Sequence, residues 1–247
     1  STLYLIPFAI GSLTIFSFEP FNFTIINFFI FPLFFYLINY INKKSKSIYR
    51  KKPYKKNFFL FVLAFGFGFY LSGLSWITNS LTFDENFKVL IPFALVLIPL
   101  FLSLFVGLTT LIIGQYLKMN FCSLLIFSSG LAFADYLRSY VFTGFPWNLW
   151  AYSTSSMNEI LQIINLIGLH CYNLFAITIF TFPIFIFFKI KKITKILSLF
   201  IVSLIVLGLH IYGNYEINKN QEVLKNTLKK IFVKVVSPNF NLEYGLS

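Results

Sequence analysis

Long apolar stretches, separated by short polar segments, occupy most of the chain. A helix that crosses the apolar core of a bilayer, about 30 Å thick, needs about 20 predominantly apolar residues. Seven stretches meet or approach this length, the first being short for a complete span: residues 3–18, 23–41, 58–77, 89–116, 120–140, 160–188 and 196–213. The pattern predicts an all-α polytopic membrane protein whose transmembrane domain covers residues 1–213.

The character of the chain changes after Gly213. Residues 214–230 are mostly polar, and residues 221–230 are compatible with a short surface helix. Residues 231–236 (Ile-Phe-Val-Lys-Val-Val) are rich in β-branched side chains, which is typical of a strand. Because a single strand is not stable alone, we expect residues 214–247 to be a linker and the opening strand of a truncated soluble domain. The start at Ser1, without a methionine, also favours a chain that is part of a longer one.

The composition agrees with a membrane location. Hydrophobic residues make up 57% of the chain and charged residues only 11%, whereas a soluble domain carries about 25% charged residues. This balance excludes a disordered chain, a disulfide-rich secreted scaffold and a cytosolic enzyme. The net charge of +12 suits either nucleic acid or anionic lipid, so the positions of the charges must decide between them.

Thirteen of the 20 basic residues lie in alternate loops, on one side of the predicted bundle. Residues 42–57 contain eight of them, Lys118 follows the fourth span and four more lie in residues 189–195, whereas Lys88 is alone in the opposite short loops. The positive-inside rule places the basic loops in the cytoplasm. We therefore expect a multi-pass membrane protein with no nucleic-acid partner, whose C-terminal segment lies outside the cytoplasm. In a bacterium this means the inner membrane, with a periplasmic C-terminal segment.

Polar groups inside a membrane are costly and need a reason. The most concentrated case is Asp135 and Arg138, which share one helical face at the outer end of the fifth span and are predicted to pair. The turn that follows them is Thr143-Gly144-Phe145-Pro146-Trp147. Glycine permits a positive φ, proline fixes the exit, and the aromatic rings suit headgroup depth. Two interpretations stay open: an interfacial anchor with an internal ion pair, or the wall of a lipid-headgroup or catalytic cavity.

Small residues distinguish a second segment, residues 66–76, which ends in Trp76. They allow a neighbouring helix to approach closely, and the tryptophan suits the outer interface. Cys122 and Cys171 both lie in apolar runs, which favours neither a disulfide framework nor a zinc site. The sequence has no phosphate-binding glycine loop and no metal-binding spacing. We expect neither a metal nor a cofactor.

Four segments, in this order, resemble the bacterial apolipoprotein N-acyltransferases: residues 11–20 (Gly-Ser-Leu-Thr-Ile-Phe-Ser-Phe-Glu-Pro), residues 66–76, residues 134–153 and residues 233–239. The third is the most specific, through Ala134-Asp-Tyr-Leu-Arg138, Thr143-Gly-Phe-Pro-Trp147 and Tyr152-Ser153. Two departures accompany the resemblance. Asp135 stands where the family usually has Glu, and Ser237-Pro238-Asn239 replaces the usual Gln-x-Asn or Gln-Gly-Asp.

The resemblance implies an enzyme of lipoprotein maturation. Such an enzyme moves an sn-1 acyl chain from a phospholipid to the N-terminal amine of a diacylglyceryl-cysteine, through a cysteine thioester. The catalytic Glu, Lys and Cys are implied to lie in an α/β nitrilase-like domain beyond Ser247, so residues 1–247 alone are expected to be inactive. The implied partners are a phospholipid acyl donor, a diacylated lipoprotein acceptor and membrane lipid, with the protein a monomer. The candidate residues of the lipid cavity are Trp76, Asp135, Arg138, Gly144, Phe145, Pro146 and Trp147.

Other classes of function compete with this interpretation. In a transporter or channel, Asp135 and Arg138 would line a pathway; the absence of an obvious internal repeat in the sequence argues against this class. A purely structural membrane scaffold is a third possibility.

Overall fold

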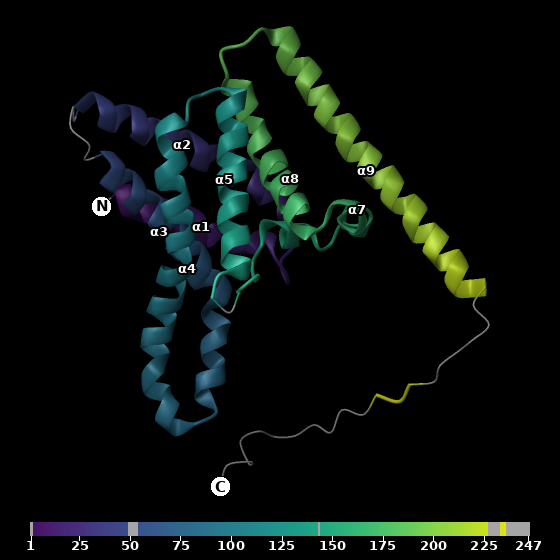
Figure 1. Cartoon of the computed structure of the whole chain (residues 1–247), viewed down its shortest axis with the longest axis horizontal. Helices are drawn as coiled ribbons and strands as arrows, with labels where there is room; N and C mark the ends of the chain where they lie inside the picture. Colours follow the sequence, from purple (N-terminus) through teal and green to yellow (C-terminus); the bar gives the residue numbers. More distant parts are fainter. Residues whose placement is uncertain (1, 49–53, 143, 227–232, 236–247) are drawn as a thin grey trace.

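The computed structural model describes residues 2–48, 54–142, 144–226 and 233–235, and within them the regular structure is helical, with no β-strand (Figure 1). The long helices are α1 (Thr2–Leu13), α2 (Asn27–Ile48), α3 (Tyr54–Leu74), α4 (Ile91–Ile113), α5 (Phe121–Tyr140), α8 (Leu169–Thr181) and α9 (Lys192–Asn226). The short ones are α6 (Asn158–Leu161) and α7 (Ile164–Ile167). The 3-10 segments are η1 (Thr14–Ser17), η2 (Thr24–Ile26), η3 (Ser75–Thr82), η4 (Glu85–Leu90), η5 (Gly114–Tyr116), η6 (Trp150–Thr154) and η7 (Phe182–Phe187).

Six helical segments in the described part of the chain are long and apolar enough to cross a membrane: Thr24–Lys44, Lys55–Thr82, Glu85–Tyr116, Phe121–Tyr140, Leu169–Phe187 and Lys192–Asn226. A shorter apolar helix, Tyr4–Ser17, corresponds to the first predicted stretch. The all-helical, multi-pass membrane architecture is therefore as predicted. Of the predicted strand, residues 233–235 form no strand in the structure, whereas residues 231, 232 and 236 and the α/β domain lie outside the described residues.

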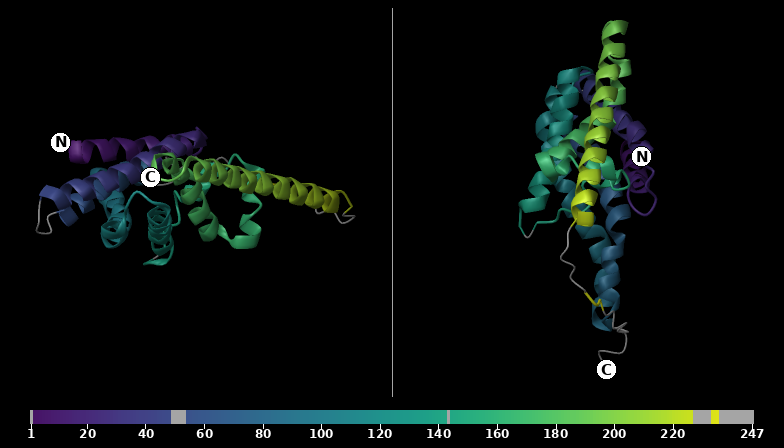
Figure 2. Two further views of the ribbon diagram at one scale, coloured as in Figure 1. Left: turned by 90° about the horizontal axis from the view of Figure 1, so that it is seen from above. Right: turned by 90° about the vertical axis from the view of Figure 1, so that its right-hand side faces the viewer.

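Two helix boundaries differ from the sequence-based expectation. The sixth span was expected from residue 160, but the long helix begins at Leu169 because Gly168, with φ +77°, turns the chain after two short helices. The seventh span was expected to end at Gly213, with a separate helix later. Instead α9 continues to Asn226 (Figure 2), because residues 214–226 contain several good helix formers and no proline.

Aromatic side chains and small residues hold the bundle together. Phe34 of α2 stacks on Phe65 of α3, with ring centroids 3.8 Å apart, at the centre of the core. A Cβ on Gly68 of α3 would lie 2.2 Å from the carbonyl oxygen of Phe8 in α1. The close approach predicted for residues 66–76 is thus confirmed, since only glycine lets the two backbones come so near.

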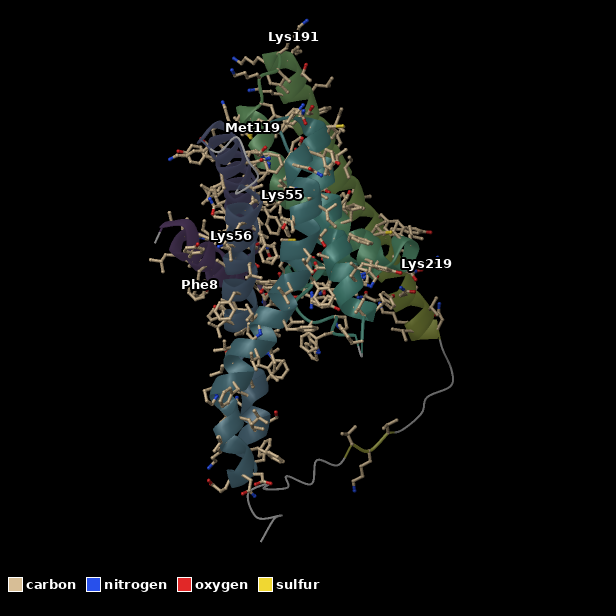
Figure 3. The ribbon with its side chains drawn as sticks, turned by 60° about the vertical axis from the view of Figure 1, so that its left-hand side comes forward. Phe8, Lys55, Lys56, Met119, Lys191 and Lys219 are labelled. Carbon is tan, nitrogen blue, oxygen red and sulfur yellow. The ribbon has the colours of Figure 1, made fainter. Side chains whose placement is uncertain are left out.

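The loops of the two predicted sides gather at opposite ends of the bundle. At the end that we call the basic end, Asn42 Nδ2 donates to the carbonyl oxygen of Gly114 at 2.6 Å, and Met119 shares a pocket with Lys189. Figure 3 shows Met119 and Lys191 toward this end of the bundle. Lys219 lies far along α9, toward the other end. The grouping of the loops agrees with the charge pattern of the sequence.

Candidate functional site

A buried ion pair lies near the C-terminal end of α5. Arg138 Nη2 donates to Asp135 Oδ1 at 3.0 Å, and the two side chains are only 1% and 2% exposed. The predicted pairing is confirmed. A pair so far from water is stable only when its remaining donors and acceptors are also satisfied, which makes their partners informative.

The second oxygen of the carboxylate joins two further elements. Asn173 Nδ2, from α8, donates to Asp135 Oδ2 at 2.8 Å, and Asn173 Oδ1 accepts from the backbone N–H of Ala151 in η6 at 2.9 Å. Asn173 is fully buried. The sequence analysis missed this residue, although an amide inside an apolar span is the kind of signal that marks such a site.

The other side of the guanidinium holds the turn that follows α5. Arg138 Nη1 donates to the carbonyl oxygens of Phe145 and Trp147, both at 2.6 Å, and the N–H of Phe145 donates back to the Arg138 carbonyl at 2.9 Å. The Tyr70 ring of α3 lies 5.2 Å from Arg138 Cζ, a cation–π distance. Arg138 is therefore a clamp inside the protein, and its side chain does not reach the rim where a headgroup would lie.

The local sequence explains the shape of the turn. Gly144 has φ +72°, as its position in the motif predicts, and a Cβ there would lie 2.5 Å from the carbonyl oxygen of Ser139. Phe142 and Asn148 also have positive φ, of 58° and 54°. These values reverse the chain within a few residues, so that the carbonyl groups after Gly144 return to Arg138. Thr143 lies outside the described residues.

Two tryptophans form the exposed part of the candidate site. Trp76, after α3, and Trp147 are 51% and 53% exposed, and their ring centroids lie 5.5 Å apart in an edge-to-face arrangement. Trp76 Nε1 donates to the carbonyl oxygen of Gly73 at 3.1 Å. We call Trp76 and Trp147 the tryptophan pair. Pro146 is also exposed, whereas Phe145 is partly buried.

The next segment, η6, is fixed to the start of α2. Thr24 Oγ1 donates to the Ser153 carbonyl oxygen at 2.5 Å, and Asn27 Nδ2 donates to Ser153 Oγ at 3.1 Å. Tyr152 is 36% exposed, and partial burial raises the pKa of its phenol, so that the hydroxyl stays protonated at neutral pH. Ser153 therefore connects η6 to the start of α2, whereas the Tyr152 side chain is partly exposed.

An apolar cavity of about 250 Å³ lies beside this segment, between α2, α6, α8 and α9. Phe28, Met157, Ala176 and Val206 are among the side chains that line it. Figure 1 shows α9 crossing the side of the bundle at a slant, so that the space between α8 and α9 widens toward one end. The cavity suits a hydrocarbon group by its lining.

Groups that perform acid–base or metal chemistry are sparse in the described part of the chain. It contains no cluster of three or more His, Cys, Asp or Glu residues able to hold a metal ion. Cys122 and Cys171 are free, exposed thiols in the first turns of α5 and α8.

Comparison with known proteins matches the region that contains this site. The family model of the apolipoprotein N-acyltransferase N-terminal domain covers residues 10–181. The apolipoprotein N-acyltransferase of Brucella melitensis is 36% identical over 120 residues, which are 48% of this chain and 23% of that protein. That of Rickettsia bellii is 31% identical over 177 residues, 71% of this chain and 34% of its own length. The matched region therefore spans about a quarter to a third of these relatives.

Proposed function

The chain belongs to the apolipoprotein N-acyltransferase family, and from this premise we propose that it is the membrane part of an enzyme that N-acylates lipoproteins. The acyl group would come from the sn-1 position of a phospholipid and pass to the N-terminal amine of a diacylglyceryl-cysteine. The membrane would be the bacterial inner membrane, with the tryptophan pair on its periplasmic side. Aromatic rings at headgroup depth support this placement.

The observation that carries the proposal is the way one buried network presents an exposed aromatic surface. Arg138 is held by Asp135 and holds the carbonyl groups on either side of Pro146. Trp147 is thereby fixed against Trp76 at the outer end of the bundle. We assign lipid contact to the tryptophan pair and to Pro146, and a positioning role to Asp135, Arg138, Gly144 and Phe145. Asn173 joins the positioning group.

The reaction itself needs groups that we do not assign to this chain. A thiolate attacks the sn-1 ester, the lysophospholipid leaves, and a thioester forms; the lipoprotein amine then attacks the thioester and regenerates the thiol. We infer from the family resemblance that the nucleophile, its base and a lysine lie in a nitrilase-like domain. Residues 1–247 alone are expected to form no thioester, and a reactive lipid probe should label neither Cys122 nor Cys171 at an enzymatic rate.

The apolar cavity supports the same proposal. It lies next to η6, between α2, α6, α8 and α9, and its lining suits an acyl chain. The competing interpretation, a transporter or channel, would need Asp135 and Arg138 to line a pathway. Their near-complete burial, and the hydrogen bonds of Arg138 Nη1 and Nη2 to groups inside the protein, argue against that role.

The test is to replace the N-acyltransferase of a bacterial host with the intact protein and measure lipoprotein N-acylation by mass spectrometry. Trp147→Ala should lower acylation about tenfold, the equivalent of about 1.4 kcal/mol of binding, with normal membrane abundance. Phe200→Ala is the matched control, because Phe200 is an exposed aromatic residue on α9, away from the tryptophan pair. Failure of the intact protein to support acylation would contradict the proposed reaction. Equal loss in both variants would contradict the role of the tryptophan pair.

A further inference from the structure

A second pocket, of about 490 Å³, lies at the basic end, opposite the tryptophan pair. One wall is the last part of α2, with Tyr36, Asn42 and Lys43, and the other is the linker before α5, with Leu117 and Lys118. The hydrogen bond from Asn42 Nδ2 to the Gly114 carbonyl oxygen, 2.6 Å long, joins the two walls. The pocket is thus built between helices and is more than a patch of surface lysines.

The charge of this pocket favours an anion. Lys43 and Lys118 stand on opposite walls, and no Asp or Glu is among the described residues that line it. Two ammonium groups on facing walls can both donate to one phosphate. Basic pockets between transmembrane helices on the cytoplasmic side are typical sites for anionic lipid headgroups, and the charge pattern predicts that this end faces the cytoplasm.

Asn42 fixes the geometry of the pocket. It is 5% exposed, and its amide joins α2 to the segment before α5. The lysines on the two walls would repel an ammonium headgroup.

The apolar lining fits the remainder of a lipid. Leu117 is buried and Met119 is partly buried, whereas Tyr36 and Tyr40 are about half exposed on α2. Such side chains suit the glycerol backbone and the first methylene groups of the acyl chains, below a phosphate held at the lysines. A free phosphate would leave this part of the pocket empty.

We propose that this pocket binds an anionic phospholipid of the inner leaflet, such as phosphatidylglycerol. Lys43 and Lys118 hold the phosphate, and Leu117 and Met119 support the glycerol and acyl portion. The site lies at the other end of the bundle from the acyl-transfer surface, so it does not depend on the proposed reaction.

The test measures retained phosphatidylglycerol on the detergent-solubilised intact protein by native mass spectrometry. Each lysine near anionic lipid contributes a factor of about five, so Lys43→Gln with Lys118→Gln should weaken binding about 30-fold. The control is Lys191→Gln with Lys192→Gln, which removes equal charge from the basic end without touching the pocket. It should change binding little. Lys43→Arg with Lys118→Arg should keep binding, which separates loss of charge from loss of fold.

Two comparisons between lipids complete the test. Phosphatidylethanolamine should bind weakly to the unaltered protein. Phosphatidylmethanol, which is anionic but has no headgroup hydroxyl, should bind about as well as phosphatidylglycerol, because the two lysines recognise the phosphate. Much weaker binding of phosphatidylmethanol would overturn the assignment of the phosphate as the recognised group. An equal loss in the control variant, or equal binding of phosphatidylethanolamine, would overturn the site.

Discussion

Arg138 shows how a permanent charge can be kept inside an apolar bundle. A guanidinium cannot be neutralised at any pH at which the protein is folded, so the protein must surround it with acceptors. The carboxylate of Asp135, two backbone carbonyl groups and the face of Tyr70 supply that surrounding. The residue therefore stabilises the turn that carries Trp147, and its effect on lipid contact is indirect.

Replacing Arg138 should destabilise the protein even when Asp135 is replaced with it, so that no unpaired charge remains. Arg138→Leu strands the Asp135 carboxylate and should lower the free energy of unfolding by about 3 kcal/mol or more. Combining it with Asp135→Leu removes the stranded charge but leaves Phe145, Trp147 and Asn173 without their partners. The double variant should stay destabilised by about 2 kcal/mol, as measured by thermal unfolding in detergent.

The chain offers a matched control for this prediction. Glu85 and Lys88 form an exposed pair with the same spacing, three residues apart. Replacing both with Leu should be nearly neutral, because exposed pairs contribute little. If the double variant of Asp135 and Arg138 were equally neutral, the hydrogen bonds from Arg138 to the turn would contribute nothing measurable to the free energy of unfolding.

Asp135 should fit its site in this bundle better than the longer Glu would. Its two oxygens already lie 3.0 Å from Arg138 and 2.8 Å from Asn173 in a fully packed site. Asp135→Glu, the residue that the family resemblance implies, adds a methylene group where there is no room. It should cost about 1–3 kcal/mol, measured as a lower midpoint of thermal unfolding. An unchanged midpoint would show that the site can expand.

At the scale of elements, α9 differs from every other long helix described. Gly213 is its only buried residue in the described range, and a Cβ there would lie 1.8 Å from the carbonyl oxygen of Glu159 in α6. Most of its apolar side chains are exposed, which suits contact with lipid. Gly213 thus provides a close backbone contact between α9 and α6, in addition to the packing of Val202 against the core.

Two glycines of α9, Gly213 and Gly208, allow the energetic weight of this contact to be tested by direct comparison. Gly213→Ala forces α9 away from α6 and should destabilise the protein by about 1–3 kcal/mol. Gly208→Ala meets no atom within 4 Å and should be neutral, or stabilising by up to about 1 kcal/mol through helix propensity. Thermal unfolding measures both effects. Thiol cross-linking between Ile160→Cys and Leu209→Cys should fall only with Gly213→Ala, and equal yields in both backgrounds would contradict the contact.

At the scale of the whole molecule, the sequence predicted what depends on composition and periodicity. The apolar stretches, the grouping of the loops, the Asp135–Arg138 pair and the positive φ of Gly144 are local properties, and the structure bears them out. The partners of Arg138 could not be predicted, because they are backbone carbonyl groups brought back by the fold. Asn173 was missed because its role depends on α8 lying beside α5. The break at Gly168 was missed because the apolar pattern continues across it.

Orientation in the membrane follows from the position of the charges and is the prediction with the widest consequences. Lys43, Lys118 and Lys189 meet at one end of the bundle, while the tryptophan pair lies at the other. Because basic residues stay on the cytoplasmic side, reporter fusions after Ser47 and Lys192 should report the cytoplasm. Fusions after Asp84 and Asn220 should report the periplasm. A periplasmic signal at Ser47 would mean that the protein has the opposite orientation in the membrane. The tryptophan pair would then lie in the leaflet opposite to the one that the proposed lipoprotein acylation requires.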